Sequence, residues 1–189
     1  MEIVHDYQRV LTAFATYGYR KASMAELAVA AGISRQTLYN RFQDKQAVLA
    51  WAVGAWAEQA EISAQEALRQ LNVSAQERVV DFFVAWVGKS VPVVRGLPHG
   101  AEIFEMATSL LHSEVDNLDT PAWTALIAFI QAEGMASDAA RADEAAYVLL
   151  LASKGLMLRV SDVAAYQAGM RRVVAYVLDT PSPVVIAAK

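Results

Sequence analysis

The stretch SMAELAVAAGIS, residues 23–34, contains the start signals of two helices separated by one glycine. Ser23 and Glu26 have the spacing of a capping box, in which each side chain accepts the other residue's backbone amide. Gly32 suits the left-handed position that follows a helix, and Ser34 suits the N-cap of the next one. The stretch therefore predicts two short helices joined by a tight turn.

Apolar residues recur at helical spacing along the rest of the chain and predict an all-helical protein of about nine helices. With 5 prolines and 9 glycines, long loops are not expected. Ser74 and Glu77 form a second capping-box pattern, Thr120-Pro121 opens a later helix, and residues 92–100 predict the main break. The helices are expected at about 3–17, 24–31, 35–42, 44–71, 74–87, 101–112, 121–134, 139–159 and 162–179.

Several classes of protein are disfavoured by composition. The chain has no cysteine, which excludes disulfides and thiolate zinc sites. Residues 1–10 do not have the pattern of a signal peptide, and Ser153, Lys154 and Arg159 interrupt the longest apolar window. Neither a nucleophile elbow nor a glycine-rich phosphate loop is found. We therefore expect a cytoplasmic protein with no cofactor and no enzymatic activity.

Charge is distributed unevenly between the two ends of the chain. Residues 1–45 contain six Lys and Arg against four Asp and Glu, a balance of +2. The total of −4 leaves −6 for residues 46–189. A mildly basic head on an acidic body predicts two parts with different partners.

The helix expected at residues 35–42 carries the side chains that suit DNA. Leu38 and Phe42 share its inner face, which leaves Arg35, Gln36, Tyr39 and Asn40 outside. An arginine can donate a fork to guanine, and a glutamine can pair with adenine. Arg41, Lys45, Ser23 and the amides beside Asp44 suit phosphates. The alternative is a capped helical hairpin with a solvated face.

The segment ASMAELAVAAGISRQTLYNRFQDKQAVL resembles the DNA-binding segment of the tetracycline-repressor-like (TetR) transcriptional regulators. The resemblance covers about residues 8–50. It differs from many members in having no Lys or Arg before Arg9, so a basic arm that contacts the minor groove is not expected. The matching residues are Gly18-Tyr19, Ser23, Leu27-Ala28, Ala31-Gly32-Ile33-Ser34, Thr37-Leu38-Tyr39, Phe42, Lys45 and Val48-Leu49.

The resemblance implies an all-helical homodimer that binds a palindromic operator, usually as a repressor, until a small molecule releases it. It implies a helix-turn-helix DNA-binding domain at 1–45 and a ligand-binding and dimerisation domain at 46–189. Arg41 stands where the family more often has His or Tyr. The predicted DNA-binding residues are Ser23, Ser34, Arg35, Gln36, Thr37, Tyr39, Asn40, Arg41 and Lys45.

Large apolar side chains after residue 74 either fill a core or line a cavity for a small, largely apolar ligand. Trp86 and Glu105 suit an aromatic or cationic ligand. A metal site at His99, Glu102, Glu105 and His112 is less favoured than a solvated face, so none is predicted. The predicted ligand-binding residues are Phe83, Trp86, Phe104, Glu105, Trp123 and Tyr147.

The last two expected helices are apolar nearly all round, so they need cover on both sides. A core covers one side, and a second subunit covers the other. The alternative is a central core helix in a monomer. The family resemblance also implies a dimer interface formed by these helices.

Two other classes of function remain open from the sequence. One is a helical ligand-binding or carrier protein whose helix-turn-helix no longer binds DNA, which would show no retention on DNA at low salt. The other is an adaptor whose head binds protein, which would retain a stable partner in a pull-down.

Overall fold

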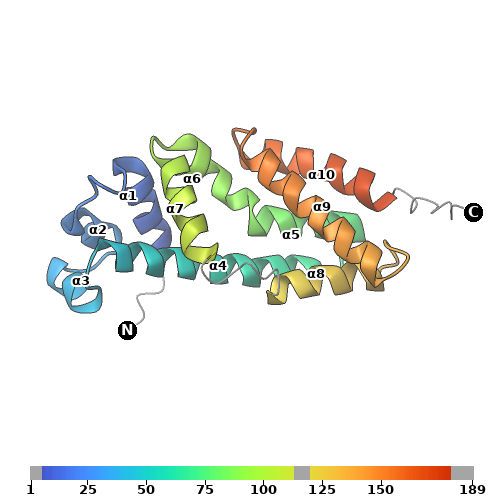
Figure 1. Cartoon of the computed structure of the whole chain (residues 1–189), viewed down its shortest axis with the longest axis horizontal. Helices are drawn as coiled ribbons and strands as arrows, with labels where there is room; N and C mark the ends of the chain where they lie inside the picture. The colour runs from blue at the N-terminus through green and yellow to red at the C-terminus, as the bar shows by residue number, and fades with distance from the viewer. Residues whose placement is uncertain (1–5, 113–119, 180–189) are drawn as a thin grey trace, which may run out of the picture. The chain divides into compact units, whose positions relative to one another are not determined.

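The computed structural model describes residues 6–112 and 120–179, and all regular structure in these ranges is helical (Figure 1). The predicted all-helical fold class is confirmed. The elements are α1 (Tyr7–Tyr17), α2 (Met24–Ala30), α3 (Arg35–Arg41), α4 (Lys45–Leu68), α5 (Ala75–Trp86), a 3-10 turn (Gly88–Ser90), α6 (Val91–Gly96), α7 (Gly100–His112), α8 (Pro121–Ala132), α9 (Ala139–Met157) and α10 (Val163–Asp179).

The predicted start and stop signals around the first turn are confirmed. Ser23 and Glu26 form both halves of the capping box at the start of α2. Gly32 has a positive φ of 68°, and the Ser34 hydroxyl accepts the amide of Thr37 at the start of α3. These local contacts fix the two short helices and the turn between them.

Three expectations differ from the structure. Residues 92–100 contain a short helix, α6, because Pro92 occupies its first turn, where a missing amide proton removes no helical hydrogen bond. Helix α1 begins at Tyr7, and the earlier residues 1–5 lie outside the described ranges. The second capping box is only half formed: Ser74 accepts the amide of Glu77, while the Glu77 carboxylate binds Arg171 instead.

Packing divides the described residues into two compact units. The head unit comprises residues 6–60 and 90–112, and the body unit comprises residues 61–89 and 120–179. The predicted boundary between residues 45 and 46 divides the chain by function, whereas these two units are defined by packing. The predicted boundary therefore stays a prediction.

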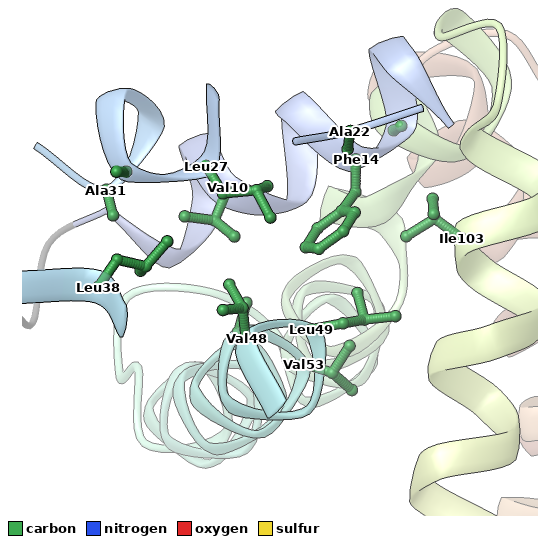
Figure 2. Close-up of a cluster of buried hydrophobic side chains, with 13 residues drawn as sticks. Val10, Phe14, Ala22, Leu27, Ala31, Leu38, Val48, Leu49, Val53 and Ile103 are labelled. Atoms are coloured by element: carbon green, nitrogen blue, oxygen red, sulfur yellow. The ribbon is translucent and has the colours of Figure 1, made fainter. Parts of the chain in front are cut away.

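The core of the head unit holds the two short helices in place (Figure 2). Val10 and Phe14 of α1 meet Leu27 of α2 and Leu38 of α3, and all four are fully buried. Val48, Leu49, Ala52 and Val53 of α4 and Ile103 of α7 belong to the same cluster. Each buried side chain of this size contributes roughly 2 kcal/mol, so the core fixes the face that α3 exposes.

The body unit is built around α10, which packs against α5 and α9. Tyr166 is fully buried, and its hydroxyl donates to Ser153 on α9 at 2.8 Å. Burial raises the pKa of the Tyr166 hydroxyl. Gly88 is required beside this ring, because a Cβ there would lie 2.7 Å from it. Tyr166 therefore fixes the packing of α10 on two neighbouring segments.

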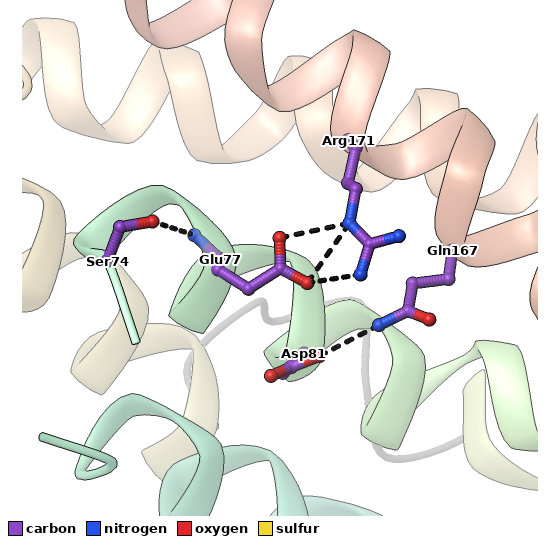
Figure 3. Close-up of polar contacts among 5 residues, drawn as sticks. All are labelled: Ser74, Glu77, Asp81, Gln167 and Arg171. Atoms are coloured by element: carbon purple, nitrogen blue, oxygen red, sulfur yellow. Dashed lines mark hydrogen bonds and ion pairs between the residues drawn. The ribbon is translucent and has the colours of Figure 1, made fainter. Parts of the chain in front are cut away.

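Polar contacts on the surface of the body unit join α5 to α10 (Figure 3). The Arg171 guanidinium donates to both carboxylate oxygens of Glu77 at 2.6–3.1 Å, which lowers the pKa of Glu77. Gln167 donates to Asp81 at 3.2 Å, but burial and the negative charge of Glu77 raise the pKa of Asp81. The two carboxylates therefore contribute opposite pH dependences to folding.

Replacing Arg171 with Met is expected to lower the free energy of unfolding only slightly at pH 7, because an exposed ion pair contributes little. A depressed pKa stabilises the fold above the ordinary carboxyl value of 4.5, and that contribution is lost as pH falls through the folded-state pKa. The difference between wild type and Arg171→Met should therefore shrink below pH 4.5. Urea unfolding at pH 7 and pH 3.5 measures it. The neighbouring exposed Arg172→Met is the control, and an equal effect from it would contradict the prediction.

Within the described ranges, no helix combines the length and the apolar character that crossing a membrane requires.

Candidate nucleic-acid interface

Helix α3 turns one apolar residue inward and its polar residues outward. Leu38 is fully buried, and Phe42 after the helix is half-buried against the ring of Trp51, at 5.3 Å between centroids. The exposed residues are Ser34, Arg35, Gln36, Thr37, Tyr39, Asn40 and Arg41. The predicted exposure of Arg35, Gln36, Tyr39 and Asn40 is confirmed, whereas the contacts of all seven residues with DNA stay predictions.

The exposed side chains of α3 are held in pairs one helical turn apart. The Arg35 guanidinium carbon lies 5.4 Å from the centre of the Tyr39 ring. Gln36 Nε2 donates to Asn40 Oδ1 at 3.0 Å. Both pairs have the i,i+4 spacing at which side chains on a helix surface meet. The face is therefore ordered before any partner binds.

The cap of α3 adds two more hydroxyl groups to this surface. Ser34 Oγ accepts the amide of Thr37 at 3.0 Å and shares a hydrogen bond with the Thr37 hydroxyl at 2.8 Å. One hydroxyl proton of the two remains available to an outside acceptor.

The Ser23 hydroxyl, which we predicted to contact a phosphate, already makes two hydrogen bonds to Glu26. It donates to Glu26 Oε2 at 2.8 Å and accepts the amide of Glu26 at 3.2 Å. The amide and the hydroxyl of Ser23 lower the pKa of Glu26, so a negative charge lies at this helix start. A phosphate that accepts the Ser23 hydroxyl proton would replace the bond from this hydroxyl to Glu26 Oε2, while both backbone bonds of the capping box could persist.

Lys45 joins the start of α4 to the turn after α1. Its Nζ donates to the carbonyl oxygen of Arg20 at 3.0 Å and lies 4.9 Å from the centre of the Tyr19 ring. Two of its three protons remain for a phosphate. Arg41, at the end of α3, is exposed. Asp44 caps α4 by accepting the amide of Ala47 at 2.8 Å.

Taken together, the short capped helices α2 and α3 pack on α1, and α3 exposes guanidinium, amide and hydroxyl groups. This arrangement defines a helix-turn-helix protein, the class in which the second helix enters the DNA major groove.

Comparison with known proteins finds one family model that matches the helix-turn-helix segment and solved structures with a similar fold. Residues 11–51 match the model of bacterial regulatory proteins, tetR family. The fold is similar to a putative TetR-family transcriptional regulator from Mesorhizobium loti, with a TM-score of 0.60 and 18% identity over 92% of this chain and 93% of that one. It is also similar to the TetR family transcriptional regulator PfmR from Thermus thermophilus, with a TM-score of 0.56 and 16% identity over 93% and 100% of the two chains.

No curated protein matches the chain. The resemblance to the TetR family is nevertheless confirmed, because residues 11–51 match that family's model and the fold is similar to that of two of its solved regulators.

The predicted ligand-binding residues fall into different parts of the structure. Phe83, Trp86 and Trp123 belong to one aromatic cluster of the body unit, with the rings of the two tryptophans 6.3 Å apart. Phe104 and Glu105 lie on α7 in the head unit. Tyr147 is 49% exposed on α9. Their contacts with a ligand stay predictions.

Two contacts in the head unit were not indicated by the sequence. The amide of His99 donates to the carbonyl oxygen of Ala15 at 2.8 Å, and the His99 ring lies against Gly18. The second is the bond from Lys45 to Arg20. Both join residues far apart in the sequence, so spacing carried no signal for them. The Gln36–Asn40 pair, in contrast, was accessible from its i,i+4 spacing.

Proposed function

We propose that the protein is a homodimeric, ligand-responsive transcriptional repressor that binds a palindromic operator in the cytoplasm. The observation that carries the proposal is the outer face of α3, where ordered donor and acceptor groups occupy the second helix of a helix-turn-helix. We assign no catalytic role to it.

Base readout in this proposal comes from Arg35 and Gln36 near the start of α3. The guanidinium fork suits O6 and N7 of guanine, and the amide suits N6 and N7 of adenine. Arg41 and the free protons of Lys45 contact phosphates, as do the hydroxyls of Thr37 and Tyr39. Ser34 and Asn40 complete the contact surface.

An apolar face on α9 supports the proposed homodimer. Tyr147, Val148 and Leu151 recur at helical spacing and are 44–52% exposed, and Leu158 follows at the end of the helix with 54% exposed. The opposite face of α9 is buried, with Leu149 and Met157 among its core residues. Tyr176 on α10 is 77% exposed. Covering such a face with the same face of a second copy is a self-complementary, two-fold arrangement.

The aromatic cluster of the body unit supports a ligand site there. Phe82, Phe83, Trp86 and Trp123 pack ring to ring. Oε1 of Glu61, on α4 in the same unit, is buried and has no hydrogen-bond partner among the described residues. Buried acceptors are normally satisfied, so a flat ligand that carries a donor or a positive charge fits the proposal. Such a ligand would release DNA because it binds one form of the dimer more tightly than the other. The favoured form is the one that cannot contact both half-sites of the operator.

The proposal is tested by selecting genomic fragments with the purified full-length protein at one near-physiological salt concentration, followed by sequencing. We expect a palindromic sequence to be enriched upstream of a gene. A variant with Arg35→Ala and Gln36→Ala is the control and should enrich no sequence. If wild type also enriches none, before and after unfolding, dialysis and refolding to remove bound ligand, the proposal is wrong.

A further inference from the structure

We propose that Asn40 is a specificity-determining residue that acts through Gln36, by restricting the Gln36 amide to the hydrogen-bonding pattern of adenine. The inference deepens the proposed function and rests on it. Its basis is the hydrogen bond from Gln36 Nε2 to Asn40 Oδ1, 3.0 Å long, between two exposed side chains on the face of α3 that carries the base-reading groups.

The inventory of donors and acceptors on Gln36 gives the reason. A glutamine amide has one oxygen acceptor and two N–H donors. One donor is bound to Asn40, which leaves one acceptor and one donor for a base. Adenine presents an N6 donor and an N7 acceptor in the major groove, so the remaining groups complement it.

The same inventory disfavours guanine. Guanine presents two acceptors, N7 and O6, whereas the held amide has only one free donor. Without Asn40 the amide is free to rotate and both of its N–H groups become available. The loss of Asn40 should therefore weaken discrimination between adenine and guanine rather than binding in general.

The neighbouring pair provides an internal reference. The Arg35 guanidinium carbon lies over the Tyr39 ring, 5.4 Å from its centre, in a cation–π contact that uses none of the N–H groups as hydrogen-bond donors. Nothing in this pair involves Asn40. A guanine preference set by Arg35 should survive the loss of Asn40, so one experiment measures both positions.

The experiment selects duplexes from a randomised library with full-length wild type, Asn40→Ala, Gln36→Ala and the double variant, at one salt concentration. For each protein we then measure dissociation constants for two duplexes: the site selected by wild type, and the same site with the adenine changed to guanine. We expect Asn40→Ala to reduce the adenine preference at least about fivefold, since a good bidentate pair discriminates by this much or more. Gln36→Ala should reduce it at the same base pair, and the two losses should not add.

Two further variants separate positioning from direct contact. Asn40→Asp keeps an acceptor for Gln36, so it should keep the adenine preference. It should bind all sequences more weakly, because its negative charge is repelled by the phosphates. Tyr39→Phe removes a hydroxyl that contacts a phosphate in the proposed complex, so it should weaken binding to all sequences and leave base preference unchanged. Circular dichroism of each variant, which should match wild type, shows that folding is intact.

The outcomes are distinct. The inference is overturned if Asn40→Ala weakens all sequences equally, or changes the preference at a base pair other than the one changed by Gln36→Ala. A wild-type protein that enriches no sequence overturns the proposed function and this inference together. A wild type that enriches a palindrome, with base preference unaltered in Asn40→Ala, overturns the inference alone.

Discussion

A protein carrying Leu151→Glu is expected to fold normally, to become a monomer, and to lose at least about 100-fold of its affinity for a palindromic operator. The side chain of Leu151 is 52% exposed between Val148 and Leu158 on the apolar face of α9, so the substitution adds no strain within one chain. In the proposed dimer, the glutamate would be buried beside its own copy across a two-fold axis, and an unpaired buried charge is strongly unfavourable. Two linked half-site contacts bind 10²–10⁴ times more tightly than one.

Sedimentation velocity measures the first part of this prediction, and titration of a fluorescent operator measures the second. Leu71→Glu is the matched control, because Leu71 is 86% exposed between α4 and α5 and lies outside the α9 face. It should remain dimeric with unchanged affinity. If Leu151→Glu also remains dimeric, the α9 face is not the interface.

The parts of the fold that follow from local rules were predictable from the sequence. Ser23, Gly32 and Ser34 fix helix ends through contacts within a few residues, and spacing alone reveals such contacts. The inward position of Leu38 follows from helical periodicity in the same way. The outward positions of Arg35, Gln36, Tyr39 and Asn40 were therefore correctly predicted.

Features that depend on distant partners were not predictable. Glu77 has the spacing of a capping-box residue, yet the guanidinium of Arg171, 94 positions later, binds its carboxylate more favourably than the amide of Ser74 does. A charged fork with two parallel bonds exceeds a single neutral amide donor. The same limit applies to Lys45, whose charge predicted a phosphate contact but whose Nζ also binds the Arg20 carbonyl.

The predicted ligand-binding residues show this limit most clearly. Phe83, Trp86 and Trp123 come together in the structure, because large apolar side chains cluster wherever helices pack. Periodicity says nothing about which helices become neighbours. Phe104 and Glu105, chosen from their side-chain types, lie on α7 in the head unit, and their contacts with a ligand stay predictions.

Replacing Gly18 with Ala is expected to lower the free energy of unfolding by about 2–4 kcal/mol, for two separable reasons. Gly18 has φ 80° and ψ 151°, a region that residues with a side chain essentially never occupy, and such strain costs about 1–3 kcal/mol. The added Cβ would also lie 3.0 Å from Nδ1 of His99. The ring must therefore shift by a few tenths of an ångström from the position in which Nδ1 pairs with Glu102 at 2.9 Å.

Urea unfolding of Gly18→Ala, His99→Ala and the double variant separates the two contributions. The steric part should disappear in the His99→Ala background, whereas the backbone part should persist there. Gly54→Ala is the control of opposite sign: Gly54 lies within α4 with no atom within 4 Å of an added Cβ, so alanine should stabilise the helix by about 0.5–1 kcal/mol. Because one glycine ends a helix and the other weakens one, the same substitution must shift the two unfolding midpoints in opposite directions. A higher unfolding midpoint for Gly18→Ala would contradict the positive φ at Gly18.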